Sequence, residues 1–222
     1  MKYGQIAGNK YINATIYRCF EFICEEDERK FVKKFCEQSL DEDQLMHTFR
    51  ELILGAYLSS NGFKVRYEHA VNGNTPDWCI LDEKVTVSGI VELMNFHVDK
   101  ATENEIEQQL RAKGLAYVWR DQNKDNIDRL YRCIWRKAQV YKPLLEKLKV
   151  PYVIGVFGEF KAAIDFDDEL RPCLLDEELG LFRLYPEVSG ALYFDDKSKG
   201  FLFSYVHNPH SLRKIGLPAG AF

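Results

Sequence analysis

The chain has 222 residues, of which 46% are hydrophobic and 29% are charged, a balance typical of a globular domain. No apolar run reaches the roughly 18–20 residues that cross a membrane, and the first residues lack the apolar core of a signal peptide. We therefore expect a cytoplasmic protein without a membrane partner. The six cysteines are scattered with no Cys-x-x-Cys pair, which disfavours a disulfide framework or a zinc site and predicts mostly buried thiols.

The net charge of −4 is distributed unevenly along the chain. Residues 111–149 hold eleven Lys/Arg and four Asp/Glu, a net charge of +7, which leaves −11 for the remainder. Such asymmetry can supply a surface that faces phosphates within an acidic protein. A solvated helix face is the alternative, and composition does not separate the two.

In the first half of the chain, the patterns predict helices followed by strands. Residues 11–40 indicate one or two helices, broken near the acidic residues 25–28, and residues 44–60 indicate a stronger helix that Asn61-Gly62 terminates. Residues 63–70 alternate as a strand, 71–74 form a turn, and 76–81 and 86–97 are two further strands.

The second half is expected to open with helices and end with strands. A polar helix is predicted at 101–115, a break at 121–125, and a long helix at 126–149 with one buried face. Residues 152–157 are continuously apolar, as in a central strand, and 160–180 are polar and irregular. Short strands are predicted at 181–185, 190–194 and 201–205.

This order of elements favours an α/β fold, a three-layer core in which helices flank a mixed sheet. The strand-rich tail completes the chain, and the helices before residue 44 precede the core. We therefore divide the sequence into an N-terminal helical extension, 1–43, and a main domain, 44–222.

Two of the strand-like runs each carry one acid where alternation predicts a core residue. These acids are Asp77, which follows Pro76, and Glu92, within an apolar stretch. A hairpin centred near Lys84/Val85 pairs positions whose numbers sum to 169, which places Asp77 directly opposite Glu92. Opposed strand residues have Cβ atoms about 4.5–5.5 Å apart, and carboxylates that close repel each other unless a cation or a proton intervenes. A divalent metal explains the pair most simply.

Each acid also has a structural alternative. Asp77 can cap the hairpin as an Asx-turn residue. Glu92, inside an apolar strand, needs a partner and can pair with a core Arg or Lys. Glu51, on the helix at 44–60, can form a pair with Arg50 or His47 at the solvent edge.

Residues 44–158 resemble the PD-(D/E)XK nuclease superfamily. The resemblance rests on the order of a helix bearing Glu51, a glycine turn, a strand, and then Pro76-Asp77 and Glu92 on a hairpin. The resemblance implies the restriction-endonuclease-like fold for the main domain. It also implies that Asp77 and Glu92 hold Mg²⁺ or Mn²⁺, with Glu51 contributing to the same site.

The sequence departs from this family at its lysine. That residue should lie two positions after the Glu, where this chain has Met94. Two explanations stay open. The amine has migrated to the following helix, where Lys137 flanks the buried stripe at Ala138, or the site has lost activity and only binds.

The expected function is therefore metal-dependent hydrolysis of nucleic-acid phosphodiester bonds, with DNA rather than RNA expected as the partner, although the sequence does not decide between the two. Glu51, Asp77, Glu92 and Lys137 are the candidate catalytic residues, and the long basic helix is expected to contact the nucleic-acid backbone through Arg129, Arg132, Arg136 and Lys142. One alternative is an inactive nuclease-derived domain that binds nucleic acid or a protein. Another is a structural partner in a larger assembly that uses the aromatic residues 192–194 and 201–203 as an interface. A homodimer is a further option.

Overall fold

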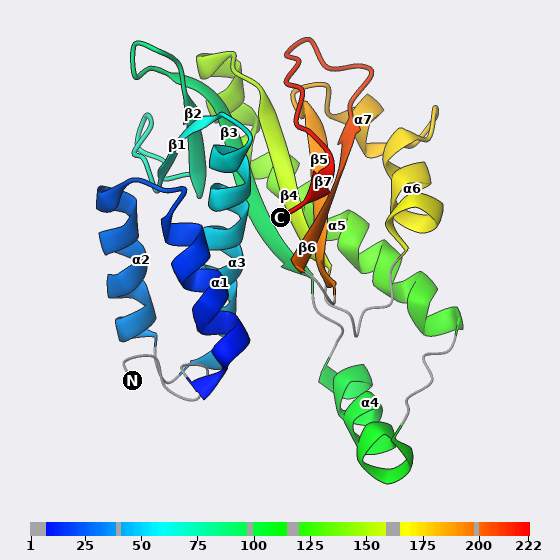
Figure 1. The fold of residues 1–222 in the computed structure, drawn as a ribbon. Helices are drawn as coiled ribbons and strands as arrows, with labels where there is room; N and C mark the ends of the chain where they lie inside the picture. The colour runs from blue at the N-terminus through cyan, green and yellow to red at the C-terminus, as the bar shows by residue number, and fades with distance from the viewer. Residues whose placement is uncertain (1–7, 39–40, 97–99, 115–119, 159–164, 198–199) are drawn as a thin grey trace. The chain divides into compact units, whose positions relative to one another are not determined.

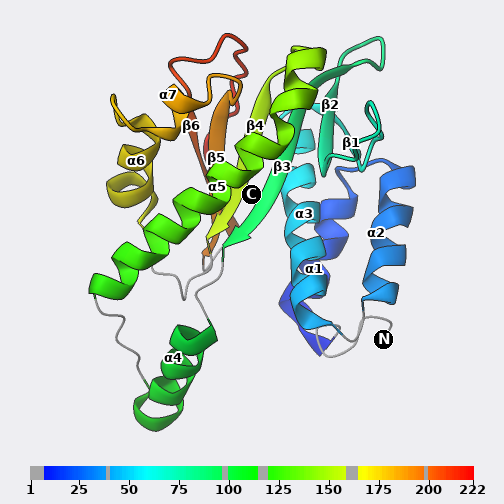
Figure 2. The same ribbon diagram turned by 180° about the vertical axis from the view of Figure 1, so that it is seen from behind.

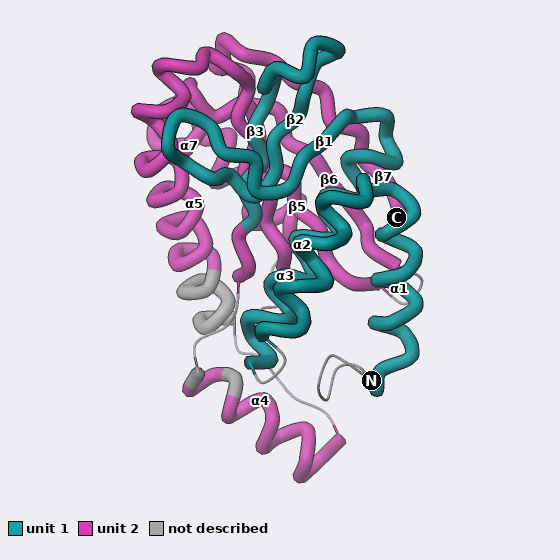
Figure 3. The backbone as a smooth tube through the Cα atoms, turned by 90° about the vertical axis from the view of Figure 1, so that its left-hand side faces the viewer, with its two compact units in different colours: residues 1–93 teal, residues 94–222 magenta. Residues whose placement is uncertain are grey.

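The computed structural model describes residues 8–38, 41–96, 100–114, 120–158, 165–197 and 200–222. These residues form seven α-helices, one π-helix and seven strands in an α/β arrangement (Figure 1). They divide into two compact units, residues 1–93 and 94–222 (Figure 3). The predicted α/β class is confirmed. The predicted boundary after residue 43 falls inside the first unit, within the helix Glu42–Ser60.

The first unit contains three helices and an antiparallel meander. The elements are α1 (Lys10–Phe20), α2 (Glu25–Glu37), α3 (Glu42–Ser60), β1 (Lys64–Tyr67), β2 (Trp78–Leu81) and β3 (Val87–Phe96), which crosses into the second unit at Leu93/Met94. Acidic residues occupy the first turn of α2, where their negative charges interact favourably with the positive end of the helix dipole. Gly62, at φ +86°, follows the end of α3 as predicted.

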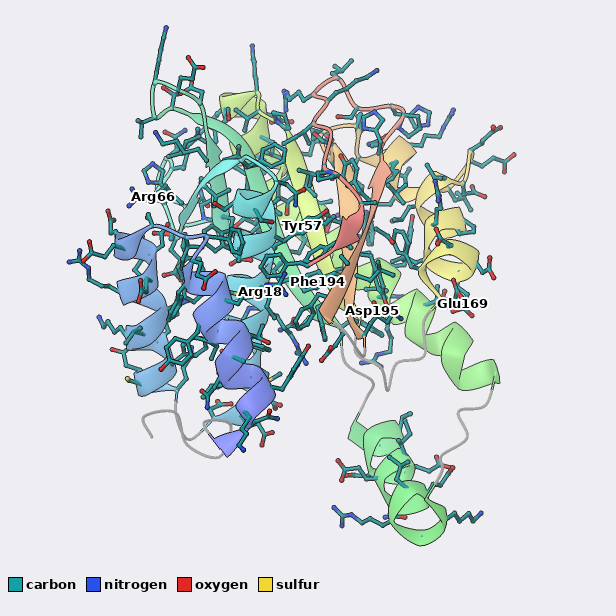
Figure 4. The ribbon with its side chains drawn as sticks, viewed as in Figure 1. Arg18, Tyr57, Arg66, Glu169, Phe194 and Asp195 are labelled. Carbon is teal, nitrogen blue, oxygen red and sulfur yellow. The ribbon has the colours of Figure 1, made fainter. Side chains whose placement is uncertain are left out.

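Helix α3 is the central element of this unit because it packs against α1, α2 and β1. Its residues from Thr48 to Leu58 are all buried. Arg66 of β1 ties the sheet to the start of α2 through ion pairs with Glu26 and the buried Asp27 (Figure 4). Asp27 also accepts a hydrogen bond from the Tyr67 backbone N–H at 3.0 Å. The helices and the meander therefore share one core.

The second unit contains a mixed sheet and the longest helix of the chain. Its elements are α4 (Lys100–Lys113), α5 (Arg120–Leu148), β4 (Tyr152–Gly158), a π-helix (Phe166–Leu170), α6 (Arg171–Leu175), α7 (Leu181–Leu184), β5 (Gly190–Lys197), β6 (Gly200–His207) and β7 (Gly220–Ala221). Strands β4 and β5 are parallel, whereas β5–β6 and β6–β7 are antiparallel. The sheet is therefore mixed, as predicted.

Helix α5 lies across one face of this sheet and contacts β4 (Figure 2). Its buried stripe includes Leu130, Ile134 and Ala138, which confirms the predicted apolar face. Tyr141 stacks on Tyr152 of β4 with ring centroids 5.1 Å apart. The aromatic side chains of β5 and β6 form the core beside it, with Phe194 stacked on Phe203 (Figure 4).

Three local predictions are wrong. Residues 121–125 belong to α5 rather than to a break, because Asp and Asn cost a helix less than 1 kcal/mol per residue and the long helix absorbs that cost. The region 160–180 includes the π-helix and α6, where a polar irregular segment was expected. Residues 181–184 form α7 instead of a strand, since a short apolar run does not identify its own secondary structure.

Tertiary contacts explain α7. Leu181 and Phe182 are fully buried, so these two side chains anchor the short helix to the core of the second unit. Asn208, also buried, donates its side-chain N–H groups to the carbonyls of Phe182 and Tyr185 at 3.1 and 3.3 Å. These bonds satisfy carbonyl groups at the end of α7 that otherwise lack partners in so short a helix.

The cysteines also differ in part from expectation. All six lie in described residues and are free thiols, but only Cys19 and Cys79 are buried. Burial raises the pKa of each of these two thiols to about 12, against a smaller effect of Arg18 on Cys19 and with a smaller contribution from Glu92 on Cys79. They behave as small core side chains rather than as reactive groups.

Candidate functional site: the Asp77–Glu92 carboxylate pair

The β2–β3 hairpin has the register that the sequence predicts next to the two acids. Trp78 pairs with Val91, Cys79 with Ile90, and the register shifts only near the turn, between Ile80 and Leu81. Asp82 closes that turn by accepting hydrogen bonds from the backbone N–H groups of Lys84 and Thr86. One further step along the pairing from Trp78/Val91 reaches Asp77 and Glu92.

The side chains of Asp77 and Glu92 each accept a hydrogen bond from the backbone on the other side of the hairpin. The Asp77 backbone N–H donates to Glu92 Oε1 at 2.9 Å, and the Leu93 backbone N–H donates to Asp77 Oδ2 at 2.7 Å. Each carboxylate is thereby anchored to the backbone of the opposite strand. We call this arrangement the carboxylate pair. The hairpin register and these bonds place the two acids across from each other, and their sharing of one cation stays a prediction.

The carboxylate pair concentrates negative charge in a shielded place. Glu92 is only 3% exposed and Asp77 is half-buried. The charge of Glu92 adds to burial in raising the pKa of Cys79. Backbone N–H groups offset part of the cost of these charges, but neighbouring carboxylates still repel one another.

The donor set of the carboxylate pair fits a small divalent cation. Each carboxylate accepts a backbone N–H through one of its oxygens, and carboxylate oxygens are ligands that Mg²⁺ prefers. Mg²⁺ is commonly held by one or two carboxylates, with water and substrate phosphate completing its octahedron. Within the described residues, no group of three or more His, Cys, Asp or Glu side chains is placed to hold a metal.

Helix α3 approaches the start of β2 closely because residue 55 is glycine. A Cβ at this position would overlap the Trp78 ring. The Trp78 indole N–H donates to the Glu51 carbonyl oxygen at 2.8 Å, and the indole packs with the rings of Phe31 and Tyr67. Trp78 therefore fixes the strand that begins one residue after Asp77 to the helix that carries Glu51.

The side chain of Glu51 lies in a polar network contributed by α2, α3 and β1. His47 Nε2 is 3.1 Å from Glu51 Oε1, while the Tyr67 hydroxyl donates to Glu51 Oε2. Lys34 Nζ lies 3.8 Å from Glu51 Oε2 and donates to the Tyr67 hydroxyl and to Glu68 Oε1, each at 2.6 Å. Both Glu51 oxygens thus have protein partners, so its role in metal binding stays a prediction.

Electrostatics connect this network with the carboxylate pair. Burial opposes ionisation of Glu51, but the hydrogen bond and charge of His47, followed by Tyr67 and Lys34, hold its pKa below the ordinary value of 4.5. Burial raises the pKa of Tyr67, and the charges of Glu51, Glu68 and Asp77 raise it further. Glu51 and Asp77 therefore both lie within electrostatic reach of the Tyr67 hydroxyl, which remains a proton donor.

The lowered pKa of Glu51 leads to a prediction about acid stability. A carboxyl whose folded-state pKa is depressed stabilises the fold above its unfolded pKa, near 4.3, and loses that contribution as the pH falls through the folded value. Glu51→Gln should therefore lower the free energy of unfolding at pH 7 by about 1–3 kcal/mol, and the difference from wild type should shrink below about pH 4. Urea titrations at pH 7 and pH 3.5 measure both quantities.

Glu37→Gln is the matched control for this experiment, because Glu37 forms only an exposed pair with Lys33 at 3.8 Å. It should change the free energy of unfolding by less than about 0.5 kcal/mol at either pH. Equal stability of wild type and Glu51→Gln at pH 7 would contradict the view that the network stabilises the first unit.

Sequence reasoning missed two members of this network. Lys34 lies three residues after Phe31, beside the apolar stripe of α2, and Tyr67 ends β1 in an alternating strand. The position of Lys34 next to the buried residues of α2 predicts a cation at the edge of the core, but no feature of the neighbouring sequence indicates that its partner is Glu51. His47 is four residues before Glu51, so that contact follows from helical spacing.

The candidate residues of the second unit differ in their surroundings. Lys137 is half-buried on α5, and its proximity to the carboxylate pair stays a prediction. Met94, which shares its strand phase with Glu92, is 8% exposed. Arg132 and Arg136 are exposed on α5. Arg129 lies over the Phe96 ring at 5.5 Å.

Lys142 has a local partner as well. Its Nζ is 3.2 Å from Glu187 Oε1, and the hydrogen bond with this acid raises the pKa of Lys142. Of the four residues predicted to contact the nucleic-acid backbone, Arg132 and Arg136 are thus the two that are exposed, whereas Arg129 and Lys142 are half-buried. The aromatic tail, offered above as an interface, is mostly core: Leu192, Tyr193, Phe194, Phe201 and Phe203 are buried, and Leu202 is exposed.

The chain was compared with protein-family models, with curated proteins and with solved structures, and none of the three comparisons gives a match. Among the described helices, none combines the length and apolar character that a membrane span requires.

Proposed function

We propose that the protein is a metal-dependent nuclease of the PD-(D/E)XK type, with a restriction-endonuclease-like core. The observation that carries this proposal is the carboxylate pair: two acids, anchored to each other's strands, in a hairpin whose register was expected from the motif. Two adjacent carboxylates on apolar strands destabilise the fold through repulsion and desolvation, and a bound cation would offset both.

In this proposal Asp77 and Glu92 hold Mg²⁺ or Mn²⁺. The bound cation would supply Lewis-acid activation of the scissile phosphate and of the attacking water. The reciprocal hydrogen bonds orient both carboxylates before a metal arrives, since the donors are backbone groups within the sheet. Glu51, fixed by His47 and Tyr67, keeps its negative charge near Tyr67 and thereby contributes to the field at the site.

A second candidate function has its own supporting observation. Met94 occupies the position of the family's lysine and is buried, so it supplies neither charge nor a hydrogen bond there. A domain with this change can retain nucleic-acid binding without cleavage. Metal binding is common to both candidates, and turnover separates them.

The test of the proposed function is an incubation of the purified chain with labelled single-stranded and duplex DNA and RNA, with Mg²⁺, with Mn²⁺, or with excess chelator. We expect cleavage that requires the metal, with DNA cut faster than RNA. We also expect the midpoint of thermal unfolding to rise with metal concentration, because a ligand that binds only the folded state stabilises it. Cleavage at full rate in chelator would exclude this mechanism, and a metal-dependent rise in the unfolding midpoint without cleavage would favour the binding-only domain.

A further inference from the structure

An exposed tryptophan lies among the arginines of α5. Trp135 is 39% exposed, although Trp is usually well covered in a folded protein. Residues three and four apart are neighbours on a helix surface, so Arg132 flanks Trp135 on its own face, and Arg136 follows Arg132 in the same row. Both arginines are exposed. Arg132 is therefore a neighbour of Trp135 on the helix surface, and Arg136, the next residue along the chain, lies on the adjoining face.

The opposite border of the indole is fixed by aromatic and backbone contacts. The Tyr185 ring meets Trp135 edge-on, with centroids 6.4 Å apart and an interplanar angle of 66°. The Tyr131 hydroxyl, one helical turn away, donates to the Leu179 carbonyl at 2.8 Å. Leu184, next to Tyr185, is itself exposed. Trp135 is therefore held from one side while part of its ring remains open to solvent.

The charge around this surface favours an anionic ligand. Residues 127–148 of the helix carry six Lys/Arg and two Asp/Glu, and Arg183 of α7 is exposed next to Leu184. A ligand that stacks on Trp135 would place its negative groups against Arg132 and Arg136.

We propose that Trp135, with Arg132 and Arg136, is a stacking platform for an unpaired base of single-stranded nucleic acid. Every base has a π-face that can stack on an indole, and the arginines meet the adjoining phosphates. A duplex keeps its bases stacked internally and offers only phosphates to this surface. This inference rests on the proposed function in that both require nucleic acid as the ligand, and it adds a preference for single strands.

The experiment measures binding in chelator, so that cleavage does not interfere. Fluorescently labelled single-stranded DNA, single-stranded RNA and a DNA duplex are titrated with wild type, Trp135→Ala, Trp135→Phe and the control Val140→Ala. Val140 is 74% exposed on the same helix and carries no ring or charge. Thermal unfolding of each variant verifies that the fold is retained.

We expect Trp135→Ala to weaken single-strand binding roughly 5- to 100-fold, and Trp135→Phe to weaken it less, because a smaller ring still stacks. Duplex binding and the Val140→Ala variant should stay within about twofold of wild type. Quenching of intrinsic fluorescence by single strands should be smaller in Trp135→Phe than in wild type. The DNA and RNA arms tell which sugar the platform accepts.

Single-strand binding by Trp135→Ala at wild-type affinity would overturn the platform while leaving the nuclease proposal intact. A change in self-association of Trp135→Ala, seen by sedimentation with no loss of single-strand binding, would assign the surface to a second copy instead. Metal-dependent cleavage that fails on every substrate while Trp135-dependent binding persists would remove the nuclease proposal and keep the platform. Absence of any nucleic-acid binding by wild type would overturn the platform directly.

Discussion

Asp77→Asn and Glu92→Gln are each expected to reduce metal-dependent cleavage more than about 100-fold, because even a residue that only supports a metal ligand typically contributes 10–100-fold. Both substitutions remove a charge while keeping an oxygen for the backbone N–H that the acid now accepts. Cleavage of labelled DNA in Mg²⁺ measures the loss. The rise of the unfolding midpoint with metal should also disappear in each variant.

The same variants test the repulsion within the carboxylate pair. In chelator, each should be at least as stable as wild type, because removing one of two adjacent buried charges relieves their repulsion. Glu83→Gln is the control, since Glu83 is an exposed acid in the turn of the same hairpin, and it should leave cleavage and metal response unchanged. Wild-type rates in both Asp77→Asn and Glu92→Gln would exclude the carboxylate pair as the catalytic site.

Lys137→Met is expected to abolish cleavage while preserving the metal-induced rise in unfolding midpoint. A cation that offsets developing charge in the transition state is worth about 10²–10³-fold in rate, whereas it is not needed to hold the metal. Lys137 is half-buried one position before Ala138 on the packed face of α5, which limits its freedom and suits a positioned amine. Adding Met94→Lys should restore part of the activity, because position 94 shares strand phase with Glu92.

Two further lysines make this experiment discriminating. Lys147→Met alters an exposed lysine of the same helix and should cleave normally. Lys34→Met removes the cation next to Glu51 and Tyr67. Loss of cleavage in Lys34→Met together with full activity in Lys137→Met would show that the amine comes from α2 and would refute the assignment to α5.

The sequence by itself determined the features that depend on local periodicity. The hairpin register follows from alternation and from a turn around Asp82, so the opposition of Asp77 and Glu92 was predictable from residue numbers. The buried stripe of α5 and the helix end at Gly62 follow from helical spacing and from the backbone freedom of glycine. Each of these signals lies within a few residues or a single hairpin.

Tertiary structure decided what depends on contacts between distant segments. Lys34 meets Tyr67 across 33 positions of sequence, so no local pattern could assign it to Glu51. Leu181–Leu184 became a helix because burial of two side chains and hydrogen bonds from Asn208 outweigh a weak intrinsic preference. The aromatic run of β5 became core because that part of the strand lies between β4 and β6 in the interior of the sheet, where its side chains pack against one another and against β6.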